Sequence, residues 1–121
     1  MPVQRILVID DESQLRAMLK RFLEIEGYEV ITAGDGKEGL RLFSQNPADL
    51  VITDLIMPDK EGVETIKELK ASNPQAKIIA MSGGGRVGPE TYLSLAKKMG
   101  AAKTFTKPFE LRSLGDAVRE L

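Results

Sequence analysis

Five polar residues stand directly after short apolar runs, where their side chains can combine in one reaction. They are Asp10, Asp11, Asp54, Ser82 and Lys107. Two carboxylates about 4 Å apart repel by roughly 4 kcal/mol at an effective dielectric constant near 20, and a divalent cation removes that cost. Oxygen donors without imidazole or thiolate favour Mg²⁺, with Mn²⁺ as a further possibility, over zinc. Together with a lysine and a hydroxyl, such a metal binds phosphoryl groups, and an aspartate in the set can form an aspartyl phosphate as the nucleophile.

The composition excludes other chemistries. The 121 residues include no histidine and no cysteine, so a Ser-His-Asp triad, a thiolate nucleophile, a disulfide and a zinc finger are all ruled out. Lys and Arg number 17 and Asp and Glu 18, a net charge of −1, which argues against direct binding of nucleic acid. The longest uncharged stretch, Ile78–Gly85, is too short to span a bilayer. With no signal-peptide pattern, we expect a cytoplasmic domain without membrane contact.

Short apolar runs alternate with amphipathic segments along the whole chain, which predicts repeated strand–helix units. The expected strands are Ile6–Ile9, Tyr28–Thr32, Leu50–Thr53, Lys77–Met81 and Lys103–Thr106. Several of these runs are apolar at every position, as is typical of strands covered on both faces. Asp35 followed by Glu38 predicts an N-terminal cap for the second helix. The pattern predicts an α/β fold with a five-stranded doubly wound parallel sheet, and residues 1–121 forming one domain.

The polar residues follow the carboxyl ends of the expected strands. In open parallel sheets, ligands bind outside the carboxyl ends of the strands. Asp10 and Asp11 follow the first expected strand, and Asp54, Ser82 and Lys107 follow the third, fourth and fifth. We therefore expect these side chains to meet at one edge of the sheet.

The same residues lie in four motifs that resemble the receiver domains of two-component response regulators, over essentially the whole chain. The motifs are Leu7–Glu12, Asp54–Pro58 with Gly62, Ser82, and Lys107–Phe109. The resemblance implies the flavodoxin-like strand order 2-1-3-4-5, with helices on both faces of the sheet. It also implies a phosphorylation-dependent signalling switch that catalyses only its own phosphorylation and dephosphorylation, not a metabolic enzyme.

The resemblance implies a phosphoacceptor and a metal site. Asp54 would accept a phosphoryl group from the phosphohistidine of a sensor histidine kinase or a phosphotransfer protein. Asp11 would bind Mg²⁺ directly and Asp10 largely through a water molecule, while Asp54 and the backbone carbonyl of Ile56 would complete the protein ligands. A chain without histidine can receive a phosphoryl group in such a relay but cannot donate one from a phosphohistidine.

The resemblance also assigns supporting residues. Lys107 would pair with the phosphoryl oxygens, Ser82 would hydrogen-bond them, and the peptide bond before Pro108 would be cis. The family usually has Tyr or Phe at the position of Thr104, where the aromatic ring acts as a rotamer switch. Phe105 is adjacent, but successive strand residues point to opposite faces, so we do not expect it to replace that ring.

The Gly-rich segment after Ser82 supports two further interpretations. It is longer than the family's usual connection, and Gly83 and Gly84 would leave the site open to water. Gly83–Gly88 also matches the G-x-G-x-x-G pattern of dinucleotide-binding folds. That pattern requires an acidic residue after the next strand, and Ala102–Thr106 is followed by lysine.

Three other interpretations remain open at this stage. The Asp10–Glu12 run can cap the following helix. A Mg²⁺-dependent phosphatase with an aspartyl-phosphate intermediate needs an acid two residues after the nucleophile, where this chain has Ile56. A degenerate receiver would act as a phosphorylation-independent binding module.

In the family, an output domain or effector usually docks on the face formed by the last two helices and the last strand. Its basic residues here are Lys97, Lys98, Lys103, Arg112 and Arg119.

Overall fold

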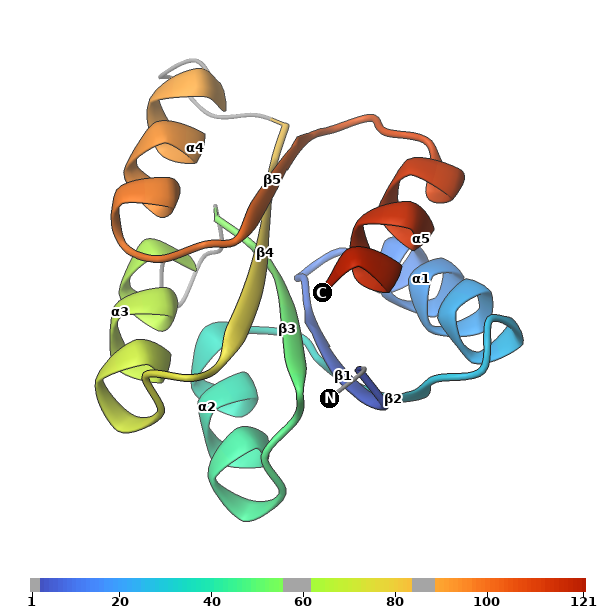
Figure 1. The fold of residues 1–121 in the computed structure, drawn as a ribbon, viewed down its shortest axis with the longest axis horizontal. Coiled ribbons are helices and arrows are strands. Elements are labelled where there is room, and N and C mark those ends of the chain that lie inside the picture. Colours follow the sequence, from blue (N-terminus) through green and yellow to red (C-terminus); the bar gives the residue numbers. More distant parts are fainter. Residues whose placement is uncertain (1–2, 56–61, 84–88) are drawn as a thin grey trace.

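The computed structural model describes residues 3–55, 62–83 and 89–121, with the backbone alone over 89–93. Five strands and five helices alternate within these residues (Figure 1). The strands are β1 (Arg5–Ile9), β2 (Glu29–Ala33), β3 (Leu50–Asp54), β4 (Lys77–Ser82) and β5 (Lys103–Thr106). The helices are α1 (Ser13–Ile25), α2 (Gly36–Gln45), α3 (Gly62–Ser72), α4 (Pro89–Lys98) and α5 (Leu111–Glu120). Each strand agrees with its predicted range to within one residue at either end.

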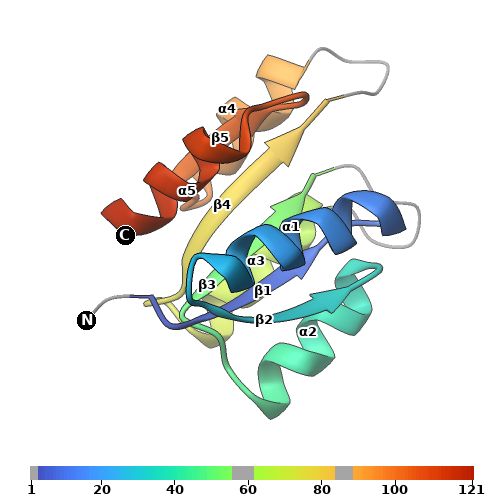
Figure 2. The ribbon, with the colours of Figure 1, turned by 90° about the vertical axis from the view of Figure 1, so that its right-hand side faces the viewer.

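All five strands are parallel and pair in the order β2-β1-β3-β4-β5. This confirms the predicted doubly wound sheet. Helices α1 and α5 cover one face, and α2, α3 and α4 cover the other (Figures 1 and 2). The carboxyl ends of β1, β3, β4 and β5 consequently lie at one edge of the sheet.

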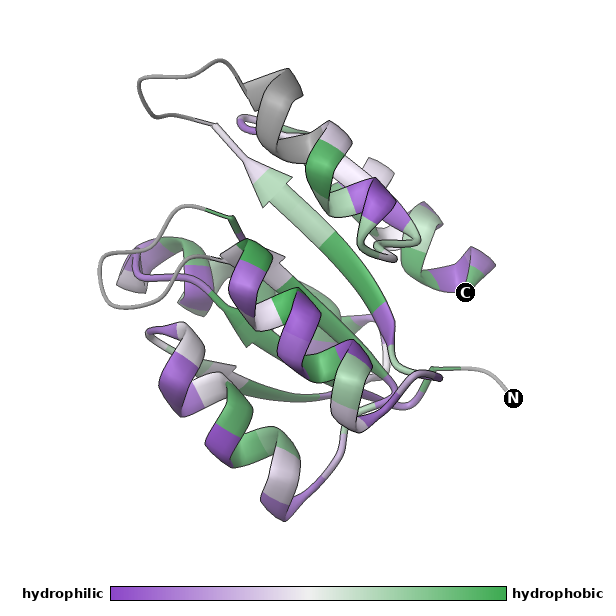
Figure 3. Cartoon of the chain, turned by 90° about the vertical axis from the view of Figure 1, so that its left-hand side faces the viewer, coloured by the Kyte–Doolittle hydropathy of each residue, from purple (hydrophilic) through white to green (hydrophobic). Residues whose placement is uncertain are grey.

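Both faces of the sheet are buried, as the apolar runs predicted. In β1, Leu7 and Ile9 pack under α2 and α3, while Ile6 and Val8 pack under α1 and α5. All four side chains are fully buried, and each contributes about 1.5–3 kcal/mol of hydrophobic stabilisation. Figure 3 shows strands coloured mainly as hydrophobic, beside helices in which hydrophobic and hydrophilic residues alternate along the ribbon. Within the part of the chain that the structure describes, no helix is long and apolar enough to cross a bilayer.

A side-chain hydrogen bond begins α2, and a glycine follows the end of α1. The Asp35 carboxylate accepts a hydrogen bond from the Glu38 backbone N–H over 2.8 Å, which confirms the predicted cap of α2. Gly27 follows α1 with a φ of +104°, a left-handed conformation that favours glycine.

A second aspartate joins β1 and β3 at the opposite end of the sheet from Asp54. Asp49 Oδ2 accepts hydrogen bonds from the backbone N–H groups of Gln4 and Arg5, each 2.9 Å long. The bonds from Arg5 and then Gln4 hold the pKa of the Asp49 carboxyl below its usual value of 3.8. Because the pKa is lowered on folding, the ionised carboxylate stabilises the fold above pH 4, and this contribution is lost as the pH falls through the lowered pKa.

We therefore predict that Asp49→Asn lowers the free energy of unfolding by about 1 kcal/mol at pH 7, since a charged acceptor of two backbone bonds is replaced by a neutral one. Urea denaturation at pH 7 and pH 3 measures the effect, and the difference from the unmodified protein should shrink at the lower pH. Asp116→Asn is the control, because Asp116 is an exposed residue of α5 whose surface ion pair contributes little. A difference that grows toward pH 3 would contradict the assignment.

Candidate functional site

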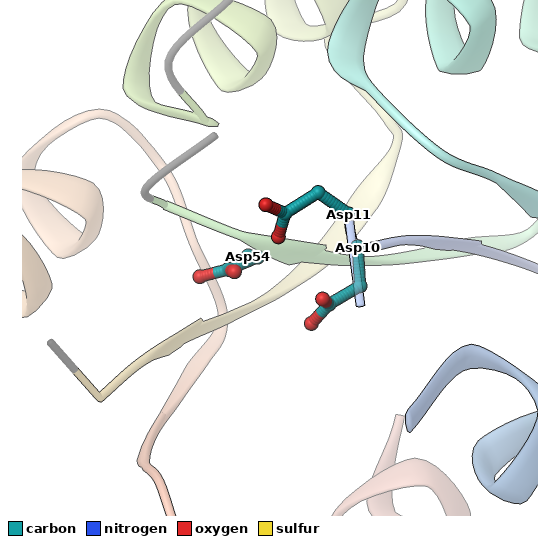
Figure 4. A group of neighbouring side chains, drawn as sticks. All are labelled: Asp10, Asp11 and Asp54. Atoms are coloured by element: carbon teal, nitrogen blue, oxygen red, sulfur yellow. The ribbon is translucent and has the colours of Figure 1, made fainter. Parts of the chain in front are cut away.

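The three predicted aspartates lie together at the carboxyl edge of the sheet. One carboxylate oxygen of each of Asp10, Asp11 and Asp54 lies within 4.8 Å of the other two. Figure 4 shows the Asp11 and Asp54 carboxylates directed into the same space, with Asp10 beside them. Asp10 and Asp54 are buried and Asp11 is exposed. The sequence prediction that these side chains meet is confirmed.

Lys107 joins two of these carboxylates. Its Nζ donates a hydrogen bond to Asp10 Oδ2 at 2.8 Å and another to Asp54 Oδ2 at 3.2 Å. Burial lowers the pKa of Lys107, but the hydrogen bond to Asp10 and the charges of Asp54 and Asp10 outweigh this effect and raise the pKa above 10.5. The ammonium group is therefore fully charged at neutral pH.

Lys107 reaches these partners across the end of β4. Strand β4 lies between β5 and β3, and strands are about 4.8 Å apart, so the lysine stem must pass over the residues that follow β4. Gly83 follows Ser82 there, and a Cβ atom at Gly83 would lie 2.5 Å from Lys107 Cβ. Glycine at this position thus provides the space in which the lysine stem crosses.

Ser82 ends β4 beside the same group. The residue is fully buried, and its hydroxyl oxygen makes no hydrogen bond to any residue that the structure describes. A buried hydroxyl without a partner costs about 1–3 kcal/mol. This hydroxyl can bind an oxygen atom brought in by a ligand at the acidic edge.

The Asp10–Glu12 run does not cap α1 in the usual way. Glu12 occupies the N-cap position, but its side chain makes no capping hydrogen bond. The Glu12 backbone N–H instead donates to Asp10 Oδ1 over 2.8 Å. Both oxygens of Asp10 therefore have partners, one in Glu12 and one in Lys107, and the carboxylate is held facing the site.

The glycine of the second motif has a packing role near Asp54. The Gly62 N–H donates to the Leu55 carbonyl oxygen over 3.0 Å. A Cβ atom at Gly62 would lie 2.1 Å from the Asp54 carbonyl oxygen. The start of α3 can therefore approach the backbone of Asp54 this closely only with glycine at this position.

The residues present fit a hard divalent cation. Three carboxylates and one ammonium leave two negative charges among the oxygens, which a divalent cation neutralises. All the donors are oxygens, the ligands that Mg²⁺ and Mn²⁺ prefer. Asp11 is exposed and makes no hydrogen bond within the described residues. Ile56, whose carbonyl was also predicted as a ligand, lies outside those residues.

The residues around Lys107 agree with the sequence expectations. The Lys107–Pro108 peptide bond is cis. Thr104 pairs in register with Ala80, which belongs to the core under α2, α3 and α4. Phe105 packs into the core on the opposite face, with its ring 5.3 Å from that of Phe109. Phe105 therefore does not occupy the face on which the family's aromatic switch is expected.

One residue near the site is not indicated by any pattern in the sequence. Arg16, in the first turns of α1, donates a hydrogen bond from Nη1 to the Asp10 carbonyl oxygen over 2.7 Å. A basic residue six positions after an aspartate is a weak signal in a sequence. Its significance depends on how α1 turns back over the end of β1.

The sheet order and its acidic carboxyl edge define the receiver class of flavodoxin-like folds. Residues 6–119 match the family model described as the response regulator receiver domain, and the chain belongs to this family. Receiver domains are regulatory parts of two-component systems, which interact with histidine kinases or phosphotransfer proteins and with output domains.

Relatives and solved structures agree with this assignment. The chain is 29% identical to sporulation initiation phosphotransferase F of Bacillus subtilis over 97% of this chain and 92% of the relative. It is 33% identical to chemotaxis protein CheY of Thermotoga maritima, over 98% and 97%. It is also 34% identical to the transcriptional regulatory protein CpxR of Escherichia coli, of which it spans only 49%. A receiver-domain crystal structure from Clostridium thermocellum superposes with a TM-score of 0.89 at 38% identity, covering 98% of this chain and 93% of the other.

The dinucleotide interpretation receives no support from these comparisons. It rested on Gly83–Gly88, of which the structure describes only Gly83. Gly84, for which we predicted an open approach to the site, lies outside the described residues as well.

We predict that Asp54→Asn lowers the pKa of Lys107, because it removes one of the two carboxylates that raise it. Titration of the Lys107 side chain by heteronuclear NMR, without divalent metal, in the unmodified protein and in the variant measures the change. An unchanged pKa of Lys107 would contradict the contact with Asp54.

We also predict that Gly83→Ala displaces Lys107, since the added methyl group would lie 2.5 Å from its Cβ. The expected cost is about 1–3 kcal/mol in the free energy of unfolding, and the pKa of Lys107 should move toward 10.5. Gly34→Ala is the matched control, because its nearest contact is an ordinary 3.4 Å to Arg16. A Gly83→Ala variant with unchanged stability and an unchanged pKa of Lys107 would show that the stem does not cross there.

Proposed function

We propose that Asp54 is the phosphoacceptor of this receiver domain and that phosphorylation switches the domain to its active state. The observation that supports this most directly is the Lys107 ammonium group, which bonds to both Asp10 and Asp54. It places a fixed positive charge at the carboxylate that would be modified. The buried Ser82 hydroxyl, which has no hydrogen-bond partner among the residues that the structure describes, supports the proposal independently. The proposed functional unit is residues 1–121.

The proposed donor is the phosphohistidine of a sensor kinase or of a phosphotransfer protein. A carboxylate oxygen of Asp54 attacks the phosphorus atom, and an O–P bond forms as the P–N bond breaks. The imidazole leaves with the electron pair of that bond and takes up a proton. Lys107 stays paired with the negative charge on the phosphoryl oxygens, and the Ser82 hydroxyl donates to one of them. In dephosphorylation, a water molecule attacks the same phosphorus atom, and the bond between phosphorus and the Asp54 oxygen breaks. This step restores the Asp54 carboxylate and releases inorganic phosphate and the proton that the water gives up.

The proposed cofactor is Mg²⁺, with Mn²⁺ able to replace it. Asp11 is the proposed direct ligand, because it is exposed and its carboxylate makes no hydrogen bond to a residue that the structure describes. Asp10 acts largely through a water molecule, since Glu12 and Lys107 bind its two oxygens. Asp54 and the backbone carbonyl of Ile56 complete the proposed protein ligands. When bound, the metal screens the repulsion between the carboxylates and the incoming phosphoryl group.

The proposed output is a population shift on the face formed by α4, β5 and α5. Two basic residues of this face already have partners, Lys103 in Glu120 and Arg119 in Glu26. Lys97, Lys98 and Arg112 are exposed and available to an output domain or an effector protein. The shift at Thr104 does not use an aromatic ring. We also propose that the phosphoryl transfer takes place in the cytoplasm. This compartment is reducing, and the absence of cysteine from the sequence is consistent with it.

We predict that the protein incubated with Mg²⁺ and phosphoramidate gains the mass of one phosphoryl group, and that Asp54→Asn does not. Phosphoramidate contains a P–N bond like that of phosphohistidine, and intact-mass spectrometry measures the product. Lys107→Met should slow the reaction about 10²–10³-fold, the usual effect of losing one charge-stabilising donor. Asp49→Asn, at the opposite end of the sheet, is the control and should be phosphorylated normally.

Two outcomes would overturn the proposal. If the unmodified protein binds Mg²⁺ but never gains mass, Asp54 is not a phosphoacceptor, and the chain is the phosphorylation-independent binding module considered above. If Asp54→Asn gains the same mass, another residue is modified.

A further inference from the structure

Arg16 holds the segment that carries two of the three aspartates. The residue is half-buried in α1, and its guanidinium Nη1 donates to the Asp10 main-chain carbonyl oxygen over 2.7 Å. The guanidinium lies over Gly34, where an added Cβ atom would lie 3.4 Å from Nη1. Arg16 therefore bridges α1 to the ends of β1 and β2.

The carbonyl that Arg16 binds lies just beyond the paired part of the sheet. The Asp10 N–H donates to the Ala33 carbonyl oxygen over 3.1 Å, beyond the last register pair of β1 and β2 at Ile9 and Ala33. Beyond Ala33, the chain leaves β2 toward α2, whose N-cap is Asp35. The Arg16 guanidinium supplies the Asp10 carbonyl with a donor where the strand pairing ends.

Three hydrogen bonds close a ring around the turn from β1 to α1. The Glu12 N–H donates to Asp10 Oδ1 at 2.8 Å, and the Arg16 N–H donates to the Glu12 carbonyl oxygen at 3.0 Å. The Arg16 side chain then returns to the Asp10 carbonyl oxygen. Asp11 lies between Asp10 and Glu12 in this turn, and it makes no hydrogen bond of its own within the described residues. The direction of its side chain therefore depends on the backbone that the three hydrogen bonds hold in place.

We propose that Arg16 is a positioning residue for the divalent cation, acting through the backbone of Asp10 and Asp11. This inference rests on the proposed function, because it assumes that the acidic edge binds Mg²⁺. A planar guanidinium holds a carbonyl in a defined direction, whereas a lysine ammonium on a flexible stem holds it less well.

The direction in which Mg²⁺ affinity changes when Arg16 is removed distinguishes a positioning role from a purely electrostatic one. Arg16 is a positive charge close to a cation site, so by Coulomb's law alone its removal would strengthen Mg²⁺ binding. If Arg16 positions Asp10 and Asp11, its removal weakens Mg²⁺ binding in spite of the more negative site. Loss of a residue that orients metal ligands typically weakens binding by 10–100-fold.

The test is a Mg²⁺ titration of the full chain by isothermal calorimetry, with no phosphodonor present. We expect Arg16→Ala to raise the Kd for Mg²⁺ about tenfold and Arg16→Lys to recover part of the loss. Arg21→Ala is the matched control, since it removes the same charge from an exposed position of the same helix. It should leave the Kd unchanged or slightly lower. Amide hydrogen exchange without metal is the second measurement, and exchange at Glu12 should be faster in Arg16→Ala.

The outcomes separate this inference from the proposed function. A folded Arg16→Ala variant that binds Mg²⁺ as tightly as the unmodified protein, or more tightly, would overturn the positioning role and leave the proposed function intact. Failure of the unmodified protein to bind Mg²⁺ would overturn both. If Arg16→Ala does not fold, Arg16→Gln and Arg16→Lys give the same comparison, and unchanged exchange at Glu12 in both would overturn the inference.

Discussion

The contact between the Lys107 ammonium group and the carboxylates of Asp10 and Asp54 is the interaction on which this site depends. Asp10 is fully buried, and a buried carboxylate without a positive partner is strongly destabilising. Lys107 supplies that partner and, through its second bond, fixes Asp54 as well. The acidic edge therefore forms one connected group of charges. A change in the charge of Asp54 alters the interactions of Lys107 and, through Lys107, those of Asp10.

The parallel sheet makes this contact possible and also constrains it. Lys107 comes from the end strand of the sheet, while Asp10 and Asp54 come from two strands nearer its middle. The lysine stem must cross β4, and the backbone of α3 must come close to Asp54. Both approaches occur at glycines, Gly83 and Gly62, where a Cβ atom would collide. The glycines of these motifs thus act by leaving space for the charged groups.

The sequence predicted much of this arrangement because parallel strands end at a common edge. Asp10, Asp11, Asp54, Ser82 and Lys107 could be placed together from the apolar runs that precede them. The bond from Arg16 to the Asp10 carbonyl could not be predicted, because it depends on how α1 folds back over β1 and not on a residue pattern. The crossing of Lys107 over Gly83 also required coordinates, since a glycine in a Gly-rich segment gives no sign of what packs against it. The face of Phe105 followed from strand alternation alone.

The Ser82 hydroxyl has a consequence for the energetics of the resting domain. With no hydrogen-bond partner in the part of the chain that the structure describes, this buried group raises the free energy of the resting state by about 1–3 kcal/mol. An oxygen that arrives within reach of Ser82 removes this penalty, so part of the free energy that favours the liganded conformation is already stored in the resting site. Replacing Ser82 with alanine therefore removes this penalty from the resting conformation, and the liganded conformation loses that contribution to its relative stability.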